Sequence, residues 1–184
     1  MEDSQLIDRF CRLGERDAAQ ELLRRYERSL TNYLWQMLRH PQDCEDAVQE
    51  TFGKVLRALP AYREENRFEQ WLFRIGRNQA LNMIQHRKRV VMDPEPENLG
   101  PQFESPLPDA AASLEAKERI QALERAIAKL PEAEREVIIL RSQADLPFKQ
   151  IAELTGAPLG TVLARAHKAR QKLKSLLDPS LSKK

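Results

Sequence analysis

The stretch from residue 148 to residue 177 holds the side chains whose types and spacing most clearly suggest a chemical task. Its apolar residues recur at helical spacing in two runs, and Gly156, Pro158 and Gly160 interrupt them. We expect the first helix to end at Gly156 and the second to begin at Thr161, whose hydroxyl can cap it. Two helices with a tight turn and a basic second helix are typical of a helix-turn-helix. The alternative is a surface hairpin with a solvated basic face.

The second of these helices has two distinct faces. One is a stripe of small or apolar residues that we expect to face a core: Val162, Ala166, Ala169, Leu173 and Leu176. The opposite face can read base edges, with arginines on its flanks for phosphates: Ala164, His167, Lys168 and Gln171, with Leu163 at the edge and Arg165 and Arg170 beside it. The net charge of the chain is only +2, so the segregation of charge, not its total, indicates nucleic acid.

A second cluster is acidic and lies in the run DCEDAVQE, residues 43–50. Asp43, Asp46 and Glu50 fall at i, i+3 and i+7, on one outward face of a helix. Carboxylates of this kind hold metals in helical bundles when a His follows a Glu by three residues, and no His has that spacing here. Two interpretations stay open: a solvated acidic face, or a docking surface for a basic protein.

A third cluster combines basic and aromatic residues over positions 68–89. The basic residues suit phosphates, and the aromatics among them either pack in a core or stack on unpaired bases: Arg74, Arg77, Arg87, Lys88 and Arg89, with Trp71 and Phe73. Asn78 and Gln79 can bond to base edges. Tyr62, in the charged loop before this stretch, either fastens the loop to the bundle or stacks on a base flipped out of a duplex.

Several classes of function have no support in the sequence. We find no nucleophile with a neighbouring base, no glycine-rich phosphate loop and no metal-ligand spacing, so we expect neither catalysis nor a cofactor. Cys11 and Cys44 lack CxxC spacing, and we expect both to be small buried or half-buried thiols. The acidic N-terminus and the lack of an apolar run near the ~20 residues of a membrane span predict a cytoplasmic protein with no membrane insertion.

The elements that must position these clusters are all helical, in two small domains. Periodicity predicts helices over residues 6–13, 43–59 and 68–89, and a further helix that Asp17 caps and that carries an apolar stripe over residues 22–38. Together they form one bundle domain at 1–89. Residues 90–112 hold five of the 11 prolines and read as a linker. Residues 113–184 form the second domain, with helices at 114–130 and 132–141 before the helix-turn-helix.

Four segments in this order resemble a known family. They are DCEDAVQETFGKVLRAL, FEQWLFRIGRNQALN, LPEAEREVIILR and IAELTGAPLGTVLARAHKARQKL. Together, over residues 6–177, they resemble the bacterial RNA polymerase sigma factors of the sigma-70 family, in the small extracytoplasmic-function group. The resemblance implies two helical domains, sigma region 2 and sigma region 4, joined by a linker without region 3. That linker would run toward the RNA exit channel.

The resemblance also implies roles for residues. The core-polymerase surface would be Asp43, Asp46, Gln49 and Glu50, docking on the β′ clamp helices, while region 4 meets the β flap. The –10 element would be read and melted by Tyr62, Arg74, Arg77, Asn78, Arg87 and Lys88. The –35 element would be read in the major groove by Thr161, Val162, Leu163, Ala164, Arg165, His167, Lys168, Arg170 and Gln171. Members of the group are often held inactive by an anti-sigma factor.

The sequence departs from the family pattern at a few positions. Leu163 and Ala164 stand where many members carry a Lys or Arg and a Ser, so they offer apolar contact instead, as to a thymine methyl. Pro147 replaces the usual Ser cap, so we expect Asp145 to cap that helix. Gly76 stands where Ala is more usual and is expected to soften its helix.

We therefore expect a dissociable specificity subunit that brings core RNA polymerase to a subset of promoters and helps to open them. One rival is a freestanding helix-turn-helix regulator of transcription, which would leave the acidic helix and the segment around Asn78 without a task. Another is a helical adaptor that binds only protein.

Overall fold

The computed structural model describes residues 2–63, 67–90 and 114–177, in two compact units that share no described element. Every regular element in these ranges is helical, as the periodicity predicted. The N-terminal unit holds α1 (Asp3–Leu13), α2 (Arg16–Leu38), α3 (Pro41–Ala58), the 3₁₀ turn η1 (Leu59–Ala61) and α4 (Phe68–Val90). The C-terminal unit holds α5 (Leu114–Ala128), α6 (Glu132–Gln143), α7 (Phe148–Thr155) and α8 (Leu159–Leu177). The predicted linker, apart from Val90, lies outside the described residues.

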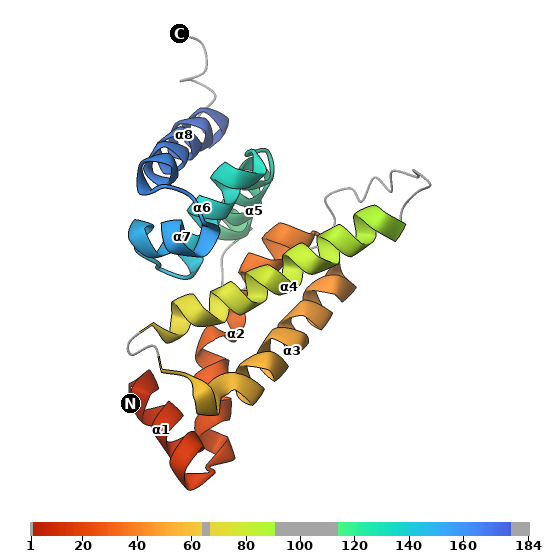
Figure 1. Ribbon diagram of the computed structural model, residues 1–184. Coiled ribbons are helices and arrows are strands. Elements are labelled where there is room, and N and C mark those ends of the chain that lie inside the picture. Colours follow the sequence, from red (N-terminus) through yellow and green to blue (C-terminus); the bar gives the residue numbers. More distant parts are fainter. Residues whose placement is uncertain (1, 64–66, 91–113, 178–184) are drawn as a thin grey trace. The chain divides into compact units, whose positions relative to one another are not determined.

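In the N-terminal unit α2 is the central helix, packing against α1, α3 and α4, while α3 and α4 lie side by side (Figure 1). The core is formed by the apolar stripes that the sequence shows at 3.6-residue spacing. Its fully buried side chains include Leu22, Leu30, Tyr33, Leu34, Val55, Leu72 and Phe73. Val48 and Phe52, at apolar positions of α3, are only half-buried.

Gly76 lies where α4 packs closely against α2 and α3. It is buried, and a Cβ on it would lie 2.9 Å from Leu30 Cδ1, 3.6 Å from Thr51 Cγ2 and 3.7 Å from Leu34 Cδ2. The glycine therefore allows a close helix approach, which is a packing role that the sequence alone did not suggest.

In the C-terminal unit α8 packs against α5, α6 and α7. Val162, Ala166 and Ala169 are buried, as the stripe predicted, whereas Leu173 is half-buried and Leu176 is exposed. A side chain from the basic helix also supports the packing, because Lys172 Nζ lies 2.9 Å from a carboxylate oxygen of the buried Glu134 on α6. The helix-turn-helix is thus anchored along α8 by small residues and by one partly buried ion pair.

The helix end at Gly156 was predicted correctly, but the side-chain caps at the helix starts were not. Gly14 and Gly156 end α1 and α7 in the left-handed conformation, with φ of 68° and 69°, and the predicted end at Gly156 is confirmed. The three predicted caps are wrong. Asp17 lies in the first turn of α2 behind Glu15, and Thr161 lies inside α8, which begins two residues earlier. Asp145 has a φ of 42° and lies before Pro147, which stands at the cap position without a side-chain bond.

Candidate nucleic-acid interface

The acidic helix α3 presents most of its predicted docking residues to solvent. Asp46, Gln49 and Glu50 are exposed. The Glu50 carboxylate is 48% exposed and lies 3.7 Å from Lys54 Nζ and 3.6 Å from an Arg57 nitrogen. Pairs this open to water are weak, so the carboxylate stays available to another cation.

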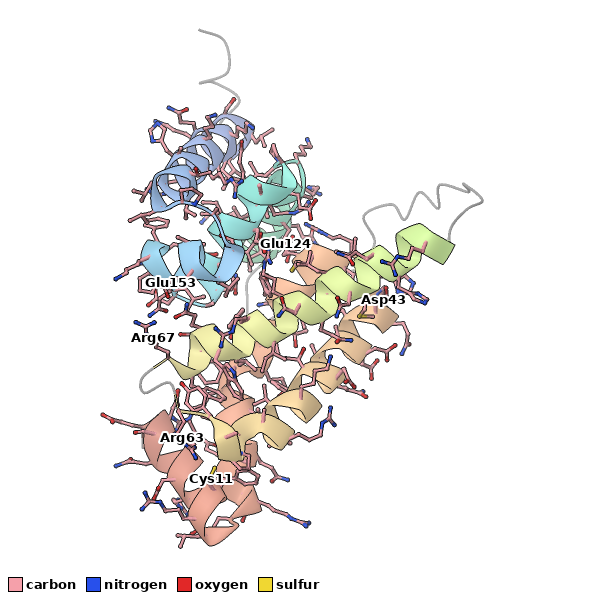
Figure 2. The ribbon with its side chains drawn as sticks, in the orientation of Figure 1. Cys11, Asp43, Arg63, Arg67, Glu124 and Glu153 are labelled. Carbon is pink, nitrogen blue, oxygen red and sulfur yellow. The ribbon has the colours of Figure 1, made fainter. Side chains whose placement is uncertain are left out.

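Asp43 is placed differently from the rest of this stripe. Its side chain is only 19% exposed, and an oxygen lies 2.5 Å from an Arg87 nitrogen on α4. Figure 2 shows Asp43 on α3 beside the later turns of α4. Its backbone N–H is also capped by His40 Nδ1 at 3.3 Å, at the start of α3. Two residues expected to bind different partners, polymerase for Asp43 and promoter DNA for Arg87, are therefore paired with each other.

Aromatic rings gather where the loop after η1 meets α4. The ring of Tyr62 lies 4.8 Å from Trp71 and 5.9 Å from Phe68, and Phe68 lies 5.4 Å from Tyr26. Tyr62 therefore fastens the loop to the bundle, one of its two predicted tasks. Phe73 is completely buried against Tyr33, so it belongs to the core.

A cavity of about 1190 Å³ opens beside this cluster, between α1, α2, η1 and the start of α4. Tyr62, Phe68 and Tyr26 line it, with Arg25 and Arg63. Arg63 donates to the carbonyl oxygens of Pro60 and Tyr62 at 3.0 and 2.8 Å and so shapes the loop. Burial, and a hydrogen bond that it donates to Asp3, raise the pKa of the Tyr26 hydroxyl. The lining also carries the carboxylates of Glu2, Asp3, Asp8 and Glu69, so its charge is mixed, while its rings suit a planar group.

The basic helix α4 brings several predicted DNA contacts to one surface. Arg74 and Asn78 are exposed, one turn apart, and Arg77 is half-buried beside them. The side chain of Lys88 lies outside the described part of the chain. Gln79 has a partner that the sequence did not indicate, because Lys54 Nζ donates to its Oε1 at 2.5 Å. Since lysine only donates, this contact turns the amide nitrogen of Gln79 away from α3.

The predicted –35 surface lies on the solvent side of α8. Exposed there are Thr161, Leu163, Ala164, His167, Lys168, Arg170 and Gln171, whereas Arg165 is half-buried. Val162 is completely buried, so its side chain belongs to the core. Nε2 of Gln171 and Nε2 of His167 lie 3.0 Å apart, which joins two of the predicted base readers to each other.

The two cysteines differ. Cys44 is buried, as expected, and lies 3.6 Å from the Thr31 carbonyl oxygen. Cys11 is exposed and lines the cavity, so the expectation of a buried or half-buried thiol is wrong there.

In the described ranges no three His, Cys, Asp or Glu side chains gather as metal ligands. Nor is any described helix long and apolar enough to span a bilayer.

Two family models match the chain, one in each unit. "Sigma-70 region 2" matches residues 22–90, and "Sigma-70, region 4" matches residues 120–173. The solved structure of the sigma factor RpoE in complex with the anti-sigma factor NepR from Bartonella quintana is similar in fold, with a TM-score of 0.72 and 26% identity. That likeness covers 89% of this chain and 98% of the RpoE chain.

Relatives match along nearly the whole length. The RNA polymerase sigma-H factor of Pseudomonas aeruginosa is 30% identical over 98% of this chain and 96% of its own. The ECF RNA polymerase sigma-E factor of Salmonella typhimurium is 31% identical over 96% of this chain and 95% of its own. With both regions matched in order, the chain belongs to the sigma-70 family of RNA polymerase sigma factors, in the extracytoplasmic-function group.

Proposed function

We propose that the two units carry out separate tasks of a sigma factor. The N-terminal unit docks on core RNA polymerase and opens the promoter, and the C-terminal unit recognises the –35 element. In the N-terminal unit Asp46, Gln49 and Glu50 on α3 would dock on core RNA polymerase. The neighbouring helix α4 would meet the –10 element through Arg74 and Asn78. These two surfaces belong to helices packed side by side, so docking fixes the position of the DNA-reading helix.

The observation that carries this proposal is the cluster of aromatic rings around Tyr62, which lies beside the cavity. A freestanding regulator reads an intact duplex and has no use for a place to hold an unstacked base, whereas a promoter-opening factor needs one. Flipping a base costs roughly a few kcal/mol, and stacking on aromatic rings returns about 1–3 kcal/mol per base. Tyr62, Trp71 and Phe68 offer such rings.

In the C-terminal unit the exposed face of α8 would enter the major groove at the –35 element. Leu163 and Ala164 would offer apolar contact, and Lys168 hydrogen bonds, while Arg165 and Arg170 meet phosphates. The protein would act in the cytoplasm, without catalysis or cofactor, and an anti-sigma factor would hold it inactive, as the complex of RpoE with NepR suggests.

Promoter binding with and without core RNA polymerase tests this proposal. We expect specific retention of a promoter fragment in a gel shift only when purified core is present. Equal binding by the isolated chain would favour the freestanding regulator. Binding to core with no preference among DNA fragments would favour a protein adaptor.

A further inference from the structure

Phe148, the first residue of α7, brings together arginines from two other helices. It is half-buried, and the guanidinium carbon of Arg141 on α6 lies over its ring, 6.0 Å from the centroid. The guanidinium carbon of Arg170 on α8 lies over the same ring at 5.9 Å. At about 6 Å the ring quadrupole still attracts a cation. One aromatic side chain therefore restrains two charged groups that the sequence separates by 29 positions.

The two arginines use their donors differently. Arg141 Nη1 donates to the carbonyl oxygens of Asp145 and Leu146, at 2.9 and 3.4 Å, and to the Asp145 carboxylate at 2.7 Å. It is therefore committed to the turn before α7. Arg170, in contrast, is exposed on α8, one residue before Gln171 of the predicted DNA-binding face.

The contact with Phe148 limits where the donors of Arg170 can point. A guanidinium carries five N–H donors in one rigid plane, so fixing its carbon over a ring restricts the directions of that fork. A free arginine side chain has about 2 kcal/mol of rotamer entropy to lose when it binds an anion. An arginine already held against a ring has less to lose, and it binds phosphate more tightly for that reason.

We propose that Phe148 is a positioning residue for DNA binding: it holds the guanidinium of Arg170 ready to bind a backbone phosphate beside the –35 element. The inference rests on the proposed role of α8 as the –35 reader. It assigns a task in DNA recognition to a side chain of α7 that need not touch DNA. The sequence signal is weak, because Phe148 fits the apolar period of α7 and reads only as core.

A double-mutant cycle tests the coupling. The full chain with core RNA polymerase is titrated with a labelled promoter duplex at several salt concentrations. Arg170→Ala should weaken binding and lower the salt slope by about one. Phe148→Leu keeps an apolar side chain but removes the ring, and we expect it to weaken binding about threefold. The double variant should bind no more weakly than Arg170→Ala alone, while Phe148→Tyr, which keeps a ring, should bind like the wild type.

Lys168→Ala is the matched control, because Lys168 lies on the same helix and no contact with Phe148 is seen among the described residues. The factor by which Lys168→Ala weakens promoter binding should multiply with the factor for Phe148→Leu in the double variant. The inference is overturned if the factors by which Phe148→Leu and Arg170→Ala weaken binding multiply in the double variant. It is also overturned if Phe148→Leu is as strongly coupled to Lys168→Ala as to Arg170→Ala. Phe148→Met replaces the leucine variant if that variant melts too early to be titrated. A wild-type chain that binds no promoter with core would refute the proposed function itself, whatever the cycle gives.

Discussion

At the scale of single residues, we propose Lys168 as the side chain that reads a base of the –35 element. His167 and Gln171 are joined to each other, and Arg170 lies over Phe148, whereas Lys168 is exposed on the same face. Lys168→Ala should therefore relax the preference at one or two positions, with a loss of about 1–3 kcal/mol in discrimination. A selection from randomised –35 sequences measures this. Recovery of the unchanged motif at lower affinity would mean that Lys168 contacts only phosphate.

Because of the buried thiol of Cys44, the stability of the folded chain should fall at alkaline pH. Burial raises the pKa of Cys44 from 9.0 to about 11. The unfolded chain thus releases this proton at lower pH than the folded chain, so stability is complete below about pH 9 and falls as the pH rises toward 11. The shift corresponds to roughly 2–3 kcal/mol at most. Urea unfolding at pH 8 and pH 10.5 should show a smaller loss for Cys44→Ala than for the wild type, and equal losses would contradict the assignment.

At the scale of elements, the sequence predicted eight helices and their apolar faces but not the contacts between polar side chains. Glycine is favoured in the left-handed conformation, so the end of α7 could be read directly. The caps at the helix starts were missed because α3 is capped by a histidine ring and α7 follows Pro147, which makes no side-chain bond. The pairing of Asp43 with Arg87 joins two helices, and periodicity within one helix cannot reveal its partner on another.

The close approach of α4 to α2 at Gly76 should tolerate one added methyl group but not a large side chain. Alanine gains roughly 0.5–1 kcal/mol of helix stability over glycine. Its Cβ would lie 2.9 Å from Leu30 Cδ1, which is the far end of a side chain and can shift. We expect Gly76→Ala to change stability by less than about 1 kcal/mol and Gly76→Leu to cost about 1–3 kcal/mol or more.

Thermal unfolding of the two Gly76 variants checks this. Partial rescue of Gly76→Leu by Leu30→Ala would locate the clash at the α2 contact. If Gly76→Leu is as stable as the wild type, the two helices are not as tightly packed there as the distances indicate.

At the scale of the whole molecule, the acidic face of α3 is the surface that we propose for docking on the polymerase. Glu50→Lys should weaken the binding of core RNA polymerase by several kcal/mol if it meets a basic surface, since like charges then face each other. Glu50→Gln should have a smaller effect, because it removes the charge without reversing it. The exposed Glu27 on α2 provides a matched control, as Glu27→Lys makes the same charge change outside the stripe.

A pull-down titration with purified core measures these affinities. Circular dichroism should show both lysine variants folded, because exposed substitutions usually change stability by only about 0.5 kcal/mol. If Glu50→Lys binds core RNA polymerase as tightly as the wild type, the acidic face of α3 is not part of the docking surface.

The contact between Tyr62 and Trp71 has an optical consequence. The chain has two tryptophans, Trp35 and Trp71, and the Trp71 ring lies 4.8 Å from the ring of Tyr62 in the loop that borders the cavity. If an extruded base enters between these rings, the emission of Trp71 should be quenched at the moment of strand opening. In a Trp35→Phe variant bound to a polymerase whose own tryptophans are replaced by a non-fluorescent analogue, stopped-flow fluorescence would time that step without an attached dye. A pre-melted promoter should give the signal sooner, and a duplex that cannot open should give none.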